Sequence, residues 1–267
     1  MQIAMSEVTT FRWSFEEDVR RYSELGYQGI GVWRQKLSDF GEDRGIDLLN
    51  ESGLSVSSLT WTGGFTGGDF RTHREAIDEG IDALRLAAAM GAECLVVYTG
   101  ARGGHTKNHA RRLALTAISE LADLAEDLDV VMAIEPMHPG CASDWTFLTR
   151  LDETLKFLDQ VQSPAVKLVF DTYHLGHSPI ADDLFAALVP RIGLVQLGDA
   201  RRPPLIEQDR CALGEGVLPL RKLLAQLIDL GYDGFFEIEL LGEEIELCDY
   251  GRLLESSQQS VAQFAVI

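Results

Sequence analysis

The stretch LIDLGYDGFFEIEL, residues 227–240, has the pattern of a helix end followed at once by a short apolar strand. Gly231 suits the left-handed cap that ends many helices, and the Phe- and Ile-rich run after it has the length and composition of a buried strand. The same pattern recurs in four other places, at residues 23–33, 50–60, 88–99 and 125–136. A pattern that repeats along a chain predicts a repeated architecture.

Strands and helices are expected to alternate along the whole chain. Three more segments have strand character, at residues 2–5, 165–172 and 192–199, which brings the expected strands to eight. Amphipathic helical patterns lie between the strands, at residues 15–25, 43–52, 73–90, 109–128, 149–161, 181–189, 218–230 and 249–264. This alternation predicts right-handed βαβ units and a parallel sheet.

Eight strand–helix units in this length fit a closed barrel better than an open doubly wound sheet. The first strand–helix turn lacks G-x-G-x-x-G, which disfavours a dinucleotide-binding fold. No linker rich in Pro, Gly or Ser divides the chain. We therefore expect an α/β protein with a single (β/α)8 TIM barrel over residues 1–267.

The charge composition excludes several classes of partner. The chain has 23 Lys and Arg against 42 Asp and Glu, a formal net charge of −19. Nucleic acids and anionic membranes attract basic surfaces, so neither is expected as a partner. No signal-peptide pattern or long apolar run is present, and the four cysteines form no C-x-x-C pair. These features predict a cytoplasmic protein with reduced thiols.

Oxygen-bearing side chains lie at the ends of four consecutive expected strands. Glu135 ends the fifth, Asp171 ends the sixth, Gln196 lies near the end of the seventh and Glu239 ends the eighth. In a barrel these strand ends form one mouth, which is where active sites lie. Strand alternation directs Glu135 inward, and on the eighth strand it directs both Glu237 and Glu239 inward.

Carboxylates that meet without a lysine or arginine between them repel one another, and a divalent cation would remove that cost. Three carboxylates and one amide carbonyl form an all-oxygen ligand set, which suits Mn²⁺ or Mg²⁺ and is compatible with Zn²⁺ or Co²⁺. A single acid at a strand end can instead cap the next helix. Four at equivalent places favour one shared metal site.

Other candidate site residues follow the same strands. His174 follows the sixth strand, His105 lies in the glycine-rich segment after the fourth, and Arg202 and Arg210 follow the seventh. An arginine near an acidic site is suited to holding substrate oxygens. Trp61, near the end of the third strand, could pack on the apolar face of a sugar ring. Each histidine or tryptophan taken alone is also compatible with a structural role.

The chain resembles the xylose isomerase-like TIM-barrel superfamily of sugar isomerases and epimerases over essentially its full length. The matching phrases, in chain order, are ELGYQGI, ESGLSVSSL, AIEP, VFDTYHLG, LVQLGD, DRCALGEG and GYDGFFEIELLG. The resemblance implies that Glu135, Asp171, Gln196 and Glu239 bind one divalent metal. In this family the seventh-strand ligand is often histidine. In having Gln196 at this position, the chain is similar to the branch that contains hydroxypyruvate isomerases and bacterial 3-dehydroshikimate dehydratases, where a glutamine replaces the histidine.

One position and two segments of the sequence indicate which branch of the superfamily the chain resembles. Ketohexose 3-epimerases carry an acidic residue six places after the fifth-strand glutamate, whereas this chain has Cys141, which disfavours sugar 3-epimerisation. The segments HPGC at 138–141 and DRCALGEG at 209–216 are more similar to inosose isomerases, which act on a cyclic keto-polyol.

The resemblance implies a divalent-metal-dependent isomerase or epimerase of a keto-sugar or keto-polyol that transfers a proton through a metal-stabilised enediolate. Glu135 and Glu239 would move the proton, and His174 would orient or protonate a substrate oxygen. Arg202 or Arg210 would hold a distal oxygen of the substrate. Family members are commonly dimers or tetramers, so a homo-oligomer is compatible with the resemblance.

Three alternatives stay open at this point. A metal-dependent dehydratase of the inosose or 3-dehydroshikimate type could use the same intermediate to expel water. A catalytically inactive binding protein is a second alternative. An apurinic endonuclease of the same fold would need a histidine-rich site for several zinc ions and a surface that attracts DNA, which six histidines and a charge of −19 disfavour.

Overall fold

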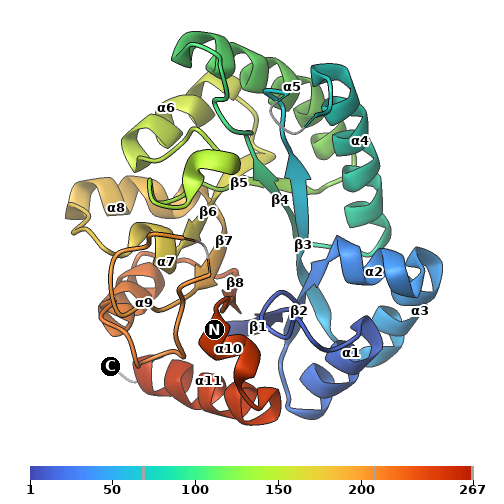
Figure 1. Ribbon diagram of the computed structural model, residues 1–267, viewed down its shortest axis with the longest axis vertical. Helices are drawn as coiled ribbons and strands as arrows, with labels where there is room; N and C mark the ends of the chain where they lie inside the picture. Colours follow the sequence, from blue (N-terminus) through green and yellow to red (C-terminus); the bar gives the residue numbers. More distant parts are fainter. Residues whose placement is uncertain (68–69, 207, 266–267) are drawn as a thin grey trace.

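The computed structural model describes residues 1–67, 70–206 and 208–265, in which eight parallel strands close into a barrel (Figure 1). The strands are β1 Gln2–Ser6, β2 Gly29–Trp33, β3 Ser55–Gly63, β4 Cys94–Tyr98, β5 Val131–Ile134, β6 Val166–Asp171, β7 Ile192–Leu197 and β8 Phe235–Ile238. Pairing of β1 with β8 closes the barrel, with Gln2 opposite Phe235 and Met5 opposite Ile238. The predicted (β/α)8 barrel is confirmed.

Helices surround the barrel, as Figure 1 shows. They are α1 Phe15–Glu24, α2 Arg34–Phe40, α3 Glu42–Ser52, α4 His73–Ala89, α5 Lys107–Asp127, α6 Leu151–Val161, α7 Thr172–Leu175, α8 Asp182–Leu188, α9 Leu220–Asp229, α10 Glu243–Leu247 and α11 Tyr250–Ala265, with 3₁₀ turns η1 Ala142–Asp144 and η2 Val189–Arg191. The expected helices are present with ends shifted by a few residues. The short helices α2, α7 and α10 were not predicted, because pieces of four to seven residues show too little periodicity.

Apolar side chains fill the interior of the barrel below its mouth. This cluster consists of Ala4, Cys94, Val96, Ala133, Val169, Leu194 and Phe235. Because side chains alternate along a strand, the residue two places further on points to the same side. That next layer is polar and consists of Ser6, Tyr98, Glu135, Asp171, Gln196 and Glu237. Strand geometry therefore delivers polar groups to one level of the barrel.

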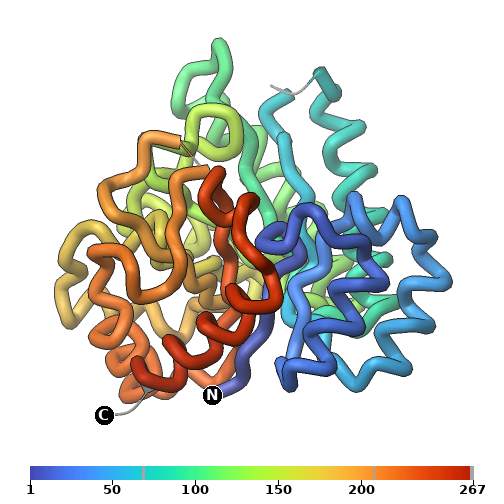
Figure 2. Tube along the Cα trace, turned by 60° about the horizontal axis from the view of Figure 1, so that its bottom comes forward, coloured from blue at the N-terminus to red at the C-terminus, as the bar shows by residue number. Residues whose placement is uncertain are grey.

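The mouth lies at the carboxyl ends of the strands. In Figure 2 the N terminus enters at the bottom, and the connections that follow β3, β4, β5 and β7 rise at the top. Among the described residues, no helix is both long enough and apolar enough to cross a membrane.

A buried ion pair joins helix α2 to helix α1, and its lysine also contacts the loop after β1. The Lys36 ammonium donates to the backbone oxygens of Glu7, at 3.1 Å, and Thr10, at 2.9 Å, and pairs with the Asp18 carboxylate. Burial and the nearby Asp18 charge raise the pKa of Glu7, whose Oε2 accepts a 2.8 Å hydrogen bond from the backbone of Trp33. Lys36 is therefore the cation that makes this acidic cluster tolerable.

We predict that Lys36→Met lowers the free energy of unfolding by about 3–5 kcal/mol, because it leaves buried carboxylates without their cation. Lys222→Met, at an exposed lysine of α9, is the matched control and should change it by less than about 0.5 kcal/mol. Denaturant titration followed by circular dichroism measures both values. Similar values for the two variants would contradict the assigned role of Lys36.

Candidate active site

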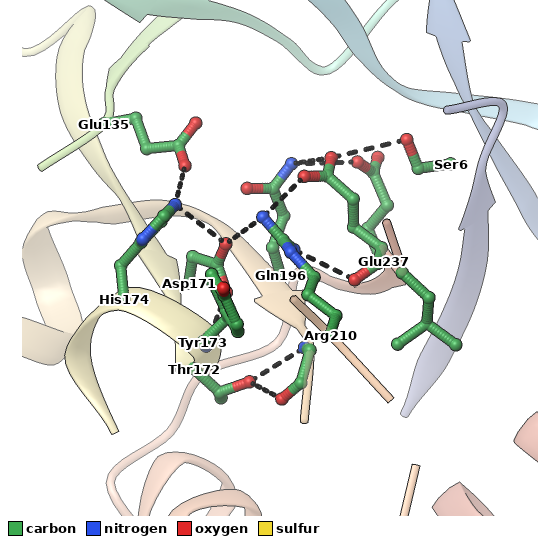
Figure 3. Close-up of polar contacts among 12 residues, drawn as sticks. Ser6, Glu135, Asp171, Thr172, Tyr173, His174, Gln196, Arg210 and Glu237 are labelled. Carbon is green, nitrogen blue, oxygen red and sulfur yellow. Dashed lines mark hydrogen bonds and ion pairs between the residues drawn. The ribbon is translucent and has the colours of Figure 1, made fainter. Parts of the chain in front are cut away.

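The four predicted ligands lie at the mouth of the barrel, and Figure 3 shows three of them, Glu135, Asp171 and Gln196, among their polar contacts. Asp171 ends β6 and Gln196 lies in β7, whereas Glu135 and Glu239 directly follow β5 and β8. All four are at most 5% exposed. Burying this many acidic and amide groups in one place is costly unless each has a partner.

Glu135, Asp171 and His174 form one buried group. Their ligand atoms all lie within 4.8 Å of one another, the arrangement of side chains that could hold a metal ion. His174 Nε2 lies 3.5 Å from Glu135 Oε1 and 3.7 Å from Asp171 Oδ2. The helix α7 begins directly after β6, and its first turn carries His174 back over the strand end. His174 thus lies where the sequence analysis expects a catalytic residue.

Arg210 lies between two of the acids. Its Nη2 is 3.2 Å from Asp171 Oδ2 and 3.2 Å from Glu239 Oε1, and its Nη1 donates to the Glu239 backbone oxygen at 2.9 Å. The guanidinium also lies 4.5 Å from the centre of the Tyr173 ring, a cation–π contact. The carboxylates were expected to meet without a lysine or arginine between them, and Arg202 or Arg210 was expected to hold a distal substrate oxygen; Arg210 instead contacts the acids themselves.

Gln196 and Glu239 are joined directly. Gln196 Nε2 donates to Glu239 Oε2 at 2.7 Å and to Glu237 Oε1 at 3.3 Å. Ser6 Oγ adds a long 3.4 Å hydrogen bond to Glu239 Oε2. Burial raises the pKa of Glu237, while hydrogen bonds from two serines and Gln196 act in the opposite direction. The eighth strand therefore supplies two carboxylates on one face, as alternation predicts.

An aromatic cavity of about 290 Å³ opens beside Glu239. Its walls include Phe11, Trp33, Trp61, Tyr98 and Trp145. The Trp61 ring meets Trp145 and Tyr98 edge-on, at centroid distances of 5.2 and 5.4 Å. Trp61 therefore forms part of the wall of this cavity.

The other two predicted substrate-binding residues lie elsewhere. Arg202 is exposed, and its Nε donates to Asp209 Oδ2 at 2.9 Å. His105 lies in the loop after β4, where its ring contacts His109 and its Nε2 is 3.0 Å from the Thr66 backbone oxygen. The described geometry does not bring either side chain to the acids.

Some residues of the site were not singled out in the sequence analysis. Tyr98 could have been found, because it lies two places after the interior Val96 on β4. Trp145 had no such signal, since it follows the short η1 turn in the loop after β5. It reaches the cavity because Gly100 N donates to the Trp145 backbone oxygen at 2.9 Å.

Fold and site together define a parallel α/β barrel with a buried acidic centre at the carboxyl mouth. The chain matches the family described as xylose isomerase-like TIM barrel over residues 19–262, and it belongs to that family. The resemblance seen in the sequence is thereby confirmed.

Among curated relatives, an inosose isomerase of Bacillus licheniformis is 26% identical over 91% of this chain and 90% of its own length. A fructoselysine 3-epimerase of Escherichia coli O157:H7 is 26% identical over 86% of each chain. A crystal structure of IolI protein with a bound zinc atom has a TM-score of 0.86 and 20% identity, covering 99% of this chain and 98% of that one. The relatives are thus isomerases and epimerases of sugar-like substrates, which supports an enzyme.

We predict that Arg210→Met lowers the free energy of unfolding of the metal-free protein by about 3–5 kcal/mol, because Asp171 and Glu239 lose their buried cation. Arg202→Met removes an exposed, solvent-screened pair with Asp209 and should leave the free energy of unfolding nearly unchanged. Guanidinium unfolding in the presence of a chelator measures both. Equal losses would show that Arg210 does not compensate the buried acids.

Proposed function

We propose that this protein is a divalent-cation-dependent isomerase or epimerase of a keto-sugar or keto-polyol. The observation that carries the proposal is that Glu135, Asp171, Gln196 and Glu239 are all buried at the carboxyl ends of their strands, within one network of polar contacts that includes His174 and Arg210. The relatives support this reaction class, and they include both an inosose isomerase and a 3-epimerase.

The residues present fit a divalent cation. Arg210 supplies one positive charge beside Asp171 and Glu239, and Glu135 adds a further carboxylate to the same site. Gln196 Oε1 is buried and accepts no hydrogen bond from the described residues. An acidic surplus and an amide oxygen that lacks a donor are what a cation site would present.

Glu135, Asp171, Gln196 and Glu239 would hold the cation, with the His174 imidazole at their side. Carboxylate and amide oxygens suit Mn²⁺ or Mg²⁺, and a neighbouring imidazole makes Zn²⁺ or Co²⁺ compatible as well. When bound, the cation would supply electrostatic stabilisation of negative charge that develops on substrate oxygens.

Proton transfer is assigned to Glu135 and Glu239. A continuous series of contacts joins them, from Glu135 to His174, Asp171, Arg210 and finally Glu239. The two glutamates are therefore the ends of one network of contacts, which supports giving both of them a part in the proton transfer. Glu135 or Glu239 would take the proton from one carbon of the substrate. The same carboxylate or the other one would then deliver a proton to the neighbouring carbon, or to the opposite face of the same carbon. His174 would donate a hydrogen bond or a proton to a substrate oxygen.

The aromatic cavity favours an uncharged substrate. None of its described lining residues is lysine, arginine or histidine, whereas it includes the carboxylates of Glu239 and Glu246. A phosphate group on a substrate would meet no basic side chain among these lining residues. Trp61 and Trp145 offer flat apolar surfaces to the carbon face of a sugar or cyclitol ring.

We predict that Glu239→Gln lowers turnover by about 10²- to 10⁴-fold, because the amide cannot accept a proton from carbon. The assay incubates the Mn²⁺-loaded protein with inosose or a ketohexose in D₂O, then measures product and carbon-bound deuterium by mass spectrometry and NMR. Glu244→Gln, at an exposed glutamate paired with Arg201, is the control and should keep full turnover.

Removal of the metal with EDTA should stop both product formation and the incorporation of deuterium at carbon, and added Mn²⁺ should restore them. Unchanged kinetics in Glu239→Gln would remove this residue from the proposal. A product lighter than the substrate by one water would replace isomerisation with the dehydratase alternative.

A further inference from the structure

Glu237 is a buried carboxylate to which the proposed reaction gives no task. It lies on β8 and is 0% exposed, one step below Glu239 on the same face of the strand. Its Oε2 accepts hydrogen bonds from the hydroxyls of Ser57, at 2.6 Å, and Ser58, at 2.7 Å. Its Oε1 is the atom that faces Gln196.

The surrounding strands are built around this carboxylate. A register shift in β3 lets consecutive serines, Ser57 and Ser58, both reach Oε2. On β2, Gly31 faces the same group, and a Cβ at that position would lie only 2.5 Å from Oε2. Glycine there leaves the room that the Glu237 carboxylate fills. Hydrogen bonds from β3 and the space left by the glycine of β2 thus hold the Glu237 carboxylate in one place.

This arrangement determines which way the Gln196 amide faces. An amide has a donating nitrogen and an accepting oxygen, whereas a carboxylate only accepts. The two carboxylates beside Gln196, those of Glu237 and Glu239, therefore both select its Nε2. Figure 3 shows Gln196 Oε1 turned away from these acids, toward the side of the site where Glu135 and His174 lie.

Glu239 is poorly suited to hold the amide unaided. Its Oε1 pairs with Arg210, and its Oε2 accepts hydrogen bonds from Ser6 and Gln196. The proposed function also asks Glu239 to bind the cation and to move a proton. Glu237 also accepts from Gln196, but the proposed function asks it neither to bind the cation nor to move a proton. A carboxylate anchored from below can keep the amide oriented while the bonds of Glu239 change.

We infer that Glu237 is a positioning residue, which holds Gln196 with its amide oxygen presented to the divalent cation. The inference rests on the proposed function, since it assumes a cation at this site. Groups that orient metal ligands in this way commonly contribute about 10- to 100-fold to metal affinity.

The test is calorimetric titration of metal-free protein with MnCl₂, with no substrate present. Glu237→Met keeps the approximate length of the side chain but removes the acceptor, and should weaken Mn²⁺ binding at least about 10-fold. Glu237→Gln can still offer an oxygen to Gln196 and turn its NH₂ to the serines, so its affinity should stay within about 3-fold of the unsubstituted protein.

A second background separates positioning from a general structural effect. In Gln196→Leu there is no amide to orient, so adding Glu237→Met should change the Mn²⁺ affinity by less than about 2-fold. If Glu237→Met does not fold, as judged by circular dichroism, Glu237→Ser takes its place. The serine hydroxyl can still accept from Ser57 or Ser58 but ends short of Gln196.

Equal losses of affinity in both backgrounds, or no loss in either, would overturn the positioning role. Absence of Mn²⁺ binding by the unsubstituted protein would overturn both this inference and the cation in the proposed function. Normal Mn²⁺ affinity in Glu237→Met together with full isomerase turnover would overturn the inference alone.

Discussion

Arg210 places one guanidinium between the carboxylates of Asp171 and Glu239, and the acidic centre of this barrel depends on that contact. Each acid is buried, so each would carry a large desolvation cost without a partner. Two features hold the guanidinium in place. The Arg210 backbone nitrogen donates to the Leu241 oxygen at 3.0 Å, and the Tyr173 ring lies against the charged group.

The closed barrel determines the rest of the site. Alternation along parallel strands puts apolar side chains such as Ala133 and Val169 in the interior and the next inward residues, Glu135 and Asp171, at the mouth. A shift of one residue in either strand would turn its acid toward the surrounding helices. Packing of the barrel interior and placement of the acids are therefore consequences of the same register.

Much of this was predictable from local sequence signals. The eight strands, the surrounding helices and the inward direction of Glu135, Glu237 and Glu239 all follow from periodicity and strand alternation, which depend on near neighbours in the chain. The resemblance to the family added a prediction of the reaction class, an isomerase or epimerase. Cys141 disfavours sugar 3-epimerisation, and the relatives include both an inosose isomerase and a fructoselysine 3-epimerase, so both reaction types stay within the proposed class.

The long loops were not predictable in the same way. Arg202 and Arg210 both follow β7, but only Arg210 turns inward, because its backbone pairs with the chain after β8. Trp145 reaches the cavity through a bridge between Gly100 and Thr146, residues that are far apart in sequence. Such contacts depend on the tertiary fold and leave no periodic signal along the chain.

The proposed function depends on a divalent cation bound by side-chain oxygens at the carboxyl ends of the strands. Anomalous diffraction at the manganese edge from crystals soaked in MnCl₂ tests it most directly. We expect one strong peak within bonding distance of oxygens from Glu135, Asp171, Gln196 and Glu239. A mouth without a peak, or a peak held only by residues outside this set, would contradict the account.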